Sequence, residues 1–187
     1  MTVSDRQFGD LSVAQLVVMA GLPGSGKSTI AEIIGARIGA TVVSVDPIES
    51  AILSAGIDAD QPTGLAAYLV AEAIAESVLV AGRSVIIDAV NAVEPARMQW
   101  RDLAARTEAV LRVIEVVCSD EELHRERLAK RVRNLPHVEE LTWRAVEQSV
   151  EGYEAWTGHS AAMPRVTVDS VQSLGSNVDA AVAFITG

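Results

Sequence analysis

The sequence predicts an α/β fold in which five parallel strands form one sheet with helices on both of its faces. Short runs rich in valine and isoleucine alternate along the chain with longer segments of helical periodicity. These short runs are hydrophobic almost throughout, as strands are when both faces of a parallel sheet are covered. The chain has 187 residues, 49% of them hydrophobic, without a break in composition or an internal repeat. Residues 1–187 are therefore expected to form a single domain.

The expected elements follow one another in a regular order. Strands are expected at 16–20, 41–45, 84–88, 110–118 and 165–168, and helices at 27–38, 47–55, 64–81, 95–107, 120–133, 142–156 and 178–185. Residues 1–12 are expected to be flexible. The apolar stretch at 64–81 is interrupted by Glu72 and Glu76, which predicts a buried amphipathic helix and not a membrane span. Because ligands of such sheets bind beyond the carboxyl ends of the strands, the functional residues should follow the strands.

A glycine-rich loop follows the first expected strand. Residues 21–29 read Gly-Leu-Pro-Gly-Ser-Gly-Lys-Ser-Thr, which matches the phosphate-binding pattern G-x-x-x-x-G-K-[ST]. Glycines allow backbone N–H groups to turn toward phosphate oxygens, and the helix N-terminus that follows favours an anion. The chain has two lysines and thirteen arginines; Lys27 therefore indicates a position that needs a compact ammonium group. The nucleotide-binding residues expected here are Gly24, Ser25, Gly26, Lys27, Ser28 and Thr29, and the Ser28 hydroxyl is expected to bind Mg²⁺.

Polar residues follow the second and third expected strands. Asp46 lies where a general base for an acceptor hydroxyl would stand, although an Asp before a Pro also commonly caps a helix, here one beginning at Pro47. Asp88 ends an apolar strand as a Walker-B-like carboxylate, and it is expected to hold Mg²⁺ opposite Ser28. Asn91 either orients the metal shell or the substrate, or it caps the following helix.

Positive charge concentrates in the helix expected after the fourth strand. Arg127 and Arg131 lie four residues apart and therefore on one face of that helix. On a mobile lid, such guanidinium groups can neutralise the charge that develops on a transferred phosphoryl group. The alternative is a solvated face with ion pairs such as Glu126 with Lys130. The loop at 169–170, after the last strand, could contact a nucleotide base.

Charge and residue usage disfavour several classes of protein. At a net charge of −10, most of the surface would repel nucleic acid, since affinity for nucleic acid depends on neutralising its phosphates. A single cysteine, Cys118, excludes an intramolecular disulfide. No basic leader followed by an apolar run is present at the N-terminus, so a cytoplasmic protein without a membrane partner is expected.

The loop, the two strand-end acids and the arginine pair resemble those of small AAA-type P-loop kinases of the polynucleotide-kinase, zeta-toxin and chloramphenicol-phosphotransferase group. The resemblance covers roughly residues 15–170. It implies a P-loop NTPase with strand order 2-3-1-4-5, an arginine-bearing helical lid at about 120–140, ATP and Mg²⁺ as cofactors, and γ-phosphoryl transfer to a hydroxyl. It also implies residue roles: Lys27 on the β- and γ-phosphates, Ser28 and Asp88 on Mg²⁺, Asp46 as base, and Arg127 and Arg131 in the lid.

The run after the second strand departs from this group. In polynucleotide kinases of this group, the corresponding residues look like D-x-x-R, and the arginine binds a substrate phosphate. This chain instead reads Asp46-Pro47-Ile48-Glu49. An acid at that position would repel a phosphate. We therefore expect a neutral or cationic small acceptor, such as a sugar, amino sugar or antibiotic, bound by Asp46, Glu49 and Asn91. A nucleotide-gated switch or ATPase and a polynucleotide 5′-hydroxyl or toxin-like kinase are the alternatives. A monomer or a homodimer is expected.

Overall fold

The computed structural model describes residues 13–130, 135–136 and 142–187. Its sheet contains the parallel strands β1 (Gln15–Ala20), β2 (Thr41–Ser44), β3 (Val85–Asp88), β4 (Val110–Val117) and β5 (Arg165–Asp169). Their order is β2-β3-β1-β4-β5, which confirms the predicted five-stranded parallel sheet and its order. The expected flexibility of residues 1–12 and much of the expected lid, at 131–134 and 137–141, lie outside the described residues.

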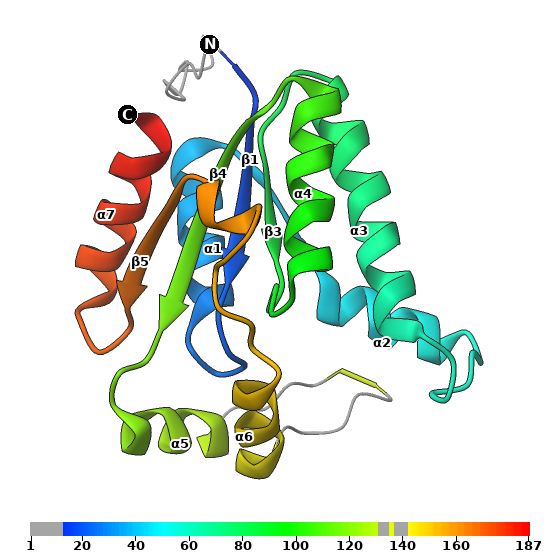
Figure 1. Ribbon diagram of the computed structural model, residues 1–187, viewed down its shortest axis with the longest axis vertical. Helices are drawn as coiled ribbons and strands as arrows, with labels where there is room; N and C mark the ends of the chain where they lie inside the picture. The colour runs from blue at the N-terminus through cyan, green and yellow to red at the C-terminus, as the bar shows by residue number, and fades with distance from the viewer. Residues whose placement is uncertain (1–12, 131–134, 137–141) are drawn as a thin grey trace, which may run out of the picture.

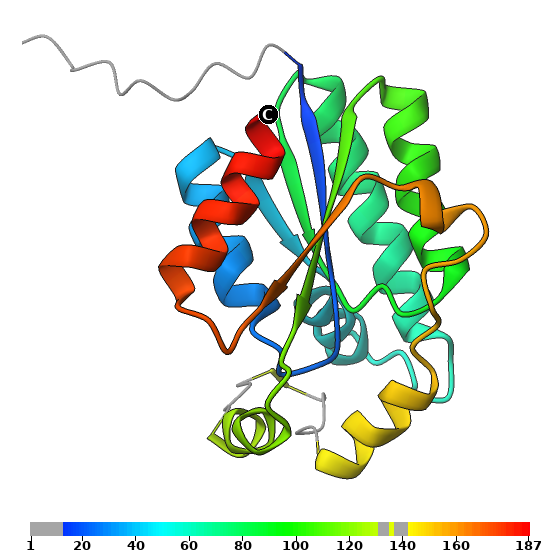
Figure 2. The ribbon, with the colours of Figure 1, turned by 60° about the vertical axis from the view of Figure 1, so that its left-hand side comes forward.

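Helices cover both faces of this sheet (Figures 1 and 2). They are α1 (Lys27–Ile38), α2 (Val45–Ser54), α3 (Thr63–Val80), α4 (Glu94–Thr107), α5 (Glu121–Lys130), α6 (Trp143–Glu151) and α7 (Leu174–Thr186), with a short 3-10 turn at Ser160–Ala162. In β1, Leu16 and Val18 face the core shared with α3 and α4, whereas Val17 and Met19 face the core shared with α1 and α7. This alternation along a fully buried strand explains its continuous hydrophobicity.

Helices α5 and α6 lie together beyond the carboxyl ends of the central strands (Figure 1). The helix predicted for 142–156 is shorter in the structure, because α6 ends at Glu151 before Gly152. The chain then leaves the helix and is held by Arg97 of α4. Its guanidinium is fully buried and donates hydrogen bonds to the carbonyls of Glu154 and Ala155 at 2.7 and 3.1 Å. These bonds fix the segment that carries α6 back to the sheet.

Helix α2 begins earlier than predicted. It starts at Val45 with Ser44 as its N-cap residue; Asp46 therefore lies in the first helical turn, and the alternative that it caps a helix beginning at Pro47 is wrong. A carboxylate in the first turn interacts favourably with the helix dipole. The structure thus places the Asp46 side chain directly after β2, at the sheet edge where ligands bind.

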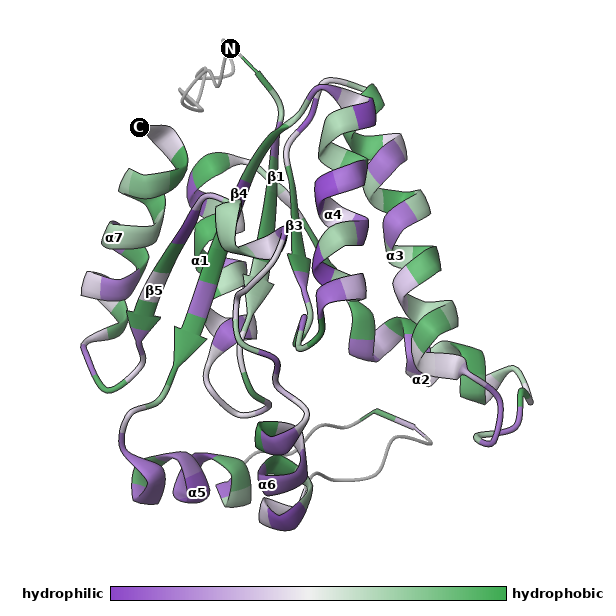
Figure 3. Ribbon diagram, in the orientation of Figure 1, coloured by the Kyte–Doolittle hydropathy of each residue, from purple (hydrophilic) through white to green (hydrophobic). Residues whose placement is uncertain are grey.

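Helix α3 differs from the amphipathic helix that was predicted. Its inner face is buried through small residues such as Ala67 and Ala71, but its outer face is also apolar, with Leu65 and Val80 60% and 75% exposed; much of this helix is coloured as hydrophobic in Figure 3. The helix has the length and hydropathy of a membrane span, with 33% of the window buried. Core helices of soluble proteins, which are mostly buried, can have the same length and hydropathy.

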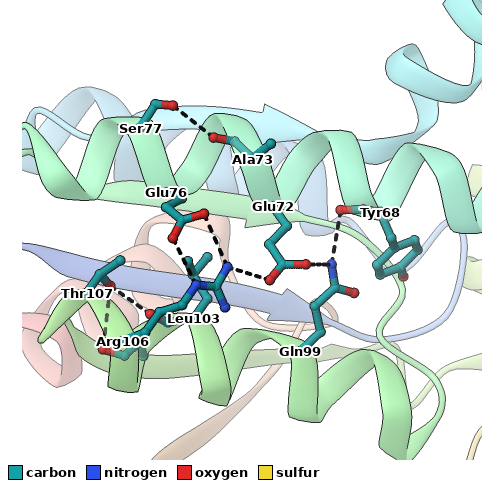
Figure 4. Close-up of polar contacts among 10 residues, drawn as sticks. Tyr68, Glu72, Ala73, Glu76, Ser77, Gln99, Leu103, Arg106 and Thr107 are labelled. Atoms are coloured by element: carbon teal, nitrogen blue, oxygen red, sulfur yellow. Dashed lines mark hydrogen bonds and ion pairs between the residues drawn. The ribbon is translucent and has the colours of Figure 1, made fainter.

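The charged residues of α3 explain why its outer face lacks polarity. Glu72 and Glu76 point sideways toward α4 (Figure 4). Arg106 lies 2.6 Å from a Glu72 oxygen and 2.9 Å from a Glu76 oxygen, and Gln99 donates to Glu72 at 2.6 Å. Hydrogen bonding to Arg106 lowers the pKa of Glu76. The two acids that interrupt the apolar sequence therefore join α3 to α4.

Candidate functional site

The phosphate loop connects β1 to α1 and lies close against the end of β4. Gly21 has φ +127°, and a Cβ atom built there would lie 2.1 Å from the Val116 carbonyl oxygen, so no larger residue fits without a backbone shift. The Gly21 N–H donates to the Val90 carbonyl at 3.1 Å. The loop is thus bonded to the segment that follows β3 and packed against the end of β4.

The loop ends in an open helix N-terminus. Gly26 is the N-cap residue of α1, with φ 99°, and none of the described side chains caps this helix. The backbone N–H groups of the first helical turn are therefore available to an anion. A cavity of about 410 Å³ lies beside this N-terminus and is lined by Gly24, Gly26 and residues 27–29. These features fit a nucleotide phosphate chain.

Lys27 occupies the position expected for the phosphate-binding lysine. It is only 7% exposed, it lines the cavity, and its Nζ donates to the Leu22 carbonyl at 2.9 Å. That bond directs the ammonium group across the loop. A compact cation held inside a backbone nest can contact two phosphate groups.

Two oxygen ligands suitable for Mg²⁺ meet in the same cavity. Ser28 and Asp88 both line it. Strand pairing places Ser44 opposite Asp88, and the Ser44 hydroxyl donates to Asp88 Oδ2 at 3.1 Å, which orients the carboxylate. In the described part of the chain, no three His, Cys, Asp or Glu side chains gather as a metal site. The pair fits Mg²⁺, which takes few protein ligands and completes its shell with phosphates and water.

Asp46 reaches this cavity from α2 and also lies near Tyr68 of α3. It lines the cavity with Lys27 and Asp88. Burial raises the pKa of the Tyr68 hydroxyl, and the charges of Asp46, Asp88 and Glu49 raise it further. The wall beside β2 and β3 is therefore acidic, with a tyrosine that stays protonated.

The acidic wall and α5, the helix that carries Arg127, lie on opposite sides of the phosphate loop. Arg127 of α5 lines the cavity and donates to the hydroxyl and the carbonyl of Ser170 at 2.7 and 2.9 Å. Ser170 follows β5, whereas Asp46 and Asp88 follow β2 and β3, and β1 lies between the two pairs of strands. This topology places Arg127 with the loop at 169–170, on the side away from the acids. Arg131 lies outside the described residues.

Two predicted substrate residues have other partners in the structure. Asn91 is fully buried; its side chain donates to the Met19 carbonyl at 2.6 Å and accepts from Trp100 Nε1 at 2.7 Å. It does not line the cavity, and Val93 is the N-cap residue of α4, so the structure assigns Asn91 a structural role. Glu49 accepts from the Thr63 hydroxyl at 2.8 Å and borders the acidic wall without lining the nucleotide cavity.

His124 is a contact residue of the phosphate loop that was not predicted from the sequence. His124 is buried in α5, and its Nε2 lies 2.7 Å from the Pro23 carbonyl oxygen, so α5 is bonded to the phosphate loop itself. A histidine within a charged helical run carries no pattern that would have indicated this contact. Ser25, predicted to bind nucleotide as part of the phosphate loop, lines a second cavity. A role of its backbone N–H in phosphate binding stays a prediction.

These features define a P-loop NTPase. The chain belongs to the AAA domain family, whose model matches residues 16–155. A comparison with curated proteins gives no match.

Solved structures share the fold. A candidate kinase from Chloroflexus aurantiacus has a TM-score of 0.71 at 18% identity, with 89% of this chain and 96% of that chain covered. A gluconokinase from Sinorhizobium meliloti has a TM-score of 0.65 at 21% identity, with 92% of each chain covered. Kti12 from Chaetomium thermophilum, in complex with ADP-AlF3, has a TM-score of 0.67 at 21% identity, with 92% of this chain and 100% of that chain covered. The predicted resemblance to small P-loop kinases is confirmed.

Proposed function

We propose that the protein is an ATP- and Mg²⁺-dependent kinase that transfers the γ-phosphoryl group to a hydroxyl of a small molecule. One observation carries the proposal: a single cavity is lined by the phosphate-loop residue Lys27, the candidate Mg²⁺ ligands Ser28 and Asp88, and the candidate base Asp46. A phosphate site alone would serve any nucleotide-binding protein. The carboxylate of Asp46 beside it adds the group that an acceptor hydroxyl requires.

Different residues of the chain have separate roles in the proposed reaction. Asp46 accepts the proton of the acceptor hydroxyl while the acceptor oxygen forms a bond to the γ-phosphorus. The bond from that phosphorus to the β–γ bridging oxygen breaks, and ADP leaves with the electron pair. Lys27 and the N–H groups at the start of α1 stabilise the negative charge on the phosphates. Mg²⁺, held by Ser28 and Asp88, would neutralise further phosphate charge.

The charges near the expected position of the acceptor favour a neutral or cationic acceptor. Besides Asp88, which would hold Mg²⁺, the charges of Asp46 and Glu49 act on the Tyr68 hydroxyl, so a phosphorylated acceptor would meet two negative charges there. The position that carries a clamping arginine in D-x-x-R is Glu49 in this chain. Sugars, amino sugars and hydroxylated antibiotics fit this environment because they present hydroxyl groups without anionic charge. We place the reaction in the cytoplasm, where the free thiol of Cys118 would stay reduced.

One observation favours a second function, a nucleotide-gated switch. His124 joins α5 directly to the phosphate loop at Pro23. A change in the loop on hydrolysis would therefore reach α5, as switch segments respond to a γ-phosphate. In this alternative, hydrolysis would proceed without an acceptor.

Transfer of label from γ-³²P-ATP to a panel of acceptors tests the proposal. The panel contains neutral sugars, amino sugars, a sugar phosphate and an oligonucleotide with a 5′-hydroxyl. We expect labelled product from a neutral or cationic member and none from the two anionic members. Comparable labelling of the oligonucleotide would contradict the small-molecule assignment. Hydrolysis of ATP without any labelled acceptor would favour the switch.

A further inference from the structure

A second cavity of about 270 Å³ lies on the other side of the phosphate loop from the nucleotide site. Its walls come from the loop, the end of β4, α5 and α6, and no described residue lines both this cavity and the nucleotide cavity. Gly21, Leu22 and Ser25 face this cavity, whereas Pro23, Gly24 and Gly26 face the nucleotide cavity. The phosphate loop thus separates the two cavities.

Ser25 is the polar group in this cavity that most clearly requires a ligand. The residue is 1% exposed, and among the described residues its Oγ has no hydrogen-bond partner. A buried hydroxyl without a partner is costly, and most native structures avoid it. The phosphate-loop pattern needs only a backbone N–H at this position, so nucleotide binding does not explain the side chain.

The other lining residues indicate which kind of ligand would fit this cavity. Leu22, Val116 and Val150 supply apolar surface. Glu115 is the only carboxylate among the described residues that line the cavity, and its oxygens already accept from Tyr153, Trp156 and Thr167 at 3.0, 2.7 and 3.0 Å.

The ionisable lining groups favour an uncharged ligand. Burial raises the pKa of Tyr153, with the Glu115 charge adding to it, so its hydroxyl keeps its proton. Among the described residues, no lysine or arginine lines this cavity, so an anion would find no permanently charged cation to balance it there. The carboxylate of Glu115 already has its donors, so a cation would have to displace them.

We propose that this cavity is a binding site for a small, uncharged, mainly apolar molecule with one hydrogen-bond acceptor, which takes the proton of Ser25 Oγ. A single polar contact in an apolar pocket is typical of small-molecule sites. The occupant lies against the face of the phosphate loop opposite the nucleotide.

The position of this site couples it to nucleotide binding. Leu22 lines the second cavity, and its carbonyl accepts the hydrogen bond of Lys27 Nζ. His124 also lines that cavity and is bonded to Pro23, which lines the nucleotide cavity. An occupant therefore restrains both the lysine and the loop, and the two ligands change each other's affinity by the same factor. This coupling rests on the nucleotide site proposed above, whereas occupancy of the cavity does not.

Two fluorinated probes of matched shape test occupancy by ¹⁹F line broadening. 4-Fluoroacetophenone carries a carbonyl acceptor, and 1-ethyl-4-fluorobenzene lacks it. We expect the ketone to bind with a Kd of about 1 mM, about fivefold tighter than the hydrocarbon. Ser25→Ala should remove the difference between the probes. Absence of binding by either probe, or equal binding to wild type and Ser25→Ala, would overturn the proposal.

A pair of tryptophan variants locates the site. Val150 lines the cavity and is 53% exposed, so Val150→Trp should fill it and abolish the binding of both probes. Val80 lies on α3, is 75% exposed and does not line the cavity; Val80→Trp should therefore leave both Kd values unchanged. Loss of binding in both variants, or in neither, would contradict the assigned location.

Calorimetry of ADP binding with and without the ketone tests the coupling. We expect the Kd of ADP to change about fivefold when the ketone saturates its site, with the same factor appearing in the Kd of the ketone when ADP is present. An unchanged ADP affinity in ketone-bound protein would overturn the coupling. Failure of ADP to bind at all would contradict the nucleotide site, while the probe pair would still decide the occupancy of the second cavity.

Discussion

Replacing Asn91 by alanine tests whether this residue holds the core together or binds substrate. Its amide bridges β1 and α4 through the Met19 carbonyl and Trp100 Nε1. Both partners belong to residues that are fully buried, so Asn91→Ala would leave a donor and an acceptor without partners. Asn91 also has φ +50°, a conformation that alanine adopts less readily than asparagine.

The size of the effect follows from these contacts. Each orphaned buried group costs about 1–3 kcal/mol, and the left-handed backbone adds about 1 kcal/mol for alanine. We therefore expect Asn91→Ala to lower the free energy of unfolding by about 4 kcal/mol. For a chain of this length, that corresponds to a fall in Tm of about 10 °C.

Urea unfolding followed by far-ultraviolet circular dichroism measures this loss. Asn91→Gly is the matched control, because it removes the same hydrogen bonds but accepts the positive φ; it should be about 1 kcal/mol more stable than Asn91→Ala. If Asn91→Ala lowered the free energy of unfolding by less than about 1 kcal/mol and raised the KM for the acceptor, the structural role would be refuted. Such a result would favour the hypothesis that Asn91 binds substrate.

The remaining predictions concern the nucleotide site and the loop after β5. Lys27→Ala should lose both ADP binding, measured by calorimetry, and phosphoryl transfer. Arg127→Ala should weaken ADP binding about tenfold, whereas Ser170→Ala, which leaves the carbonyl contact of the arginine intact, should weaken it less. Hydrogen bonds from Ser119 and from the Val171 N–H lower the pKa of Asp169. Its contribution to stability is therefore present above the ordinary carboxyl pKa and lost as the pH falls, and Asp169→Asn should flatten the decline of Tm between about pH 5 and pH 3.

The sheet and the candidate nucleotide-binding residues could be predicted because the sequence patterns that indicate them are local. The loop at 21–29 has a fixed spacing, and buried strands such as β1 are apolar at nearly every position, here at all but Gln15. Asp46 and Asp88 follow directly from the rule that ligands lie beyond strand ends. Their shared cavity in the structure matches that prediction.

Residues whose partners are distant in sequence could not be predicted in this way. Asn91 follows a strand as a ligand residue would, but its partner Met19 lies 72 positions away. His124 contacts a carbonyl 101 positions away. The exposed apolar face of α3 was unexpected because Glu72 and Glu76 suggested a polar side, and only the position of Arg106 shows where they point. Tertiary contacts decide such cases, and a single sequence does not contain them.

The most direct test of the proposed function compares wild type with Asp46→Asn. Transfer of label to the best acceptor and the Kd of ADP are measured on both proteins. We expect transfer to fall at least about 10²-fold in Asp46→Asn, because the base is lost, while the Kd of ADP changes little. Equal transfer by the two proteins would contradict the role of Asp46 and, with it, the assignment of this cavity as a phosphoryl-transfer site.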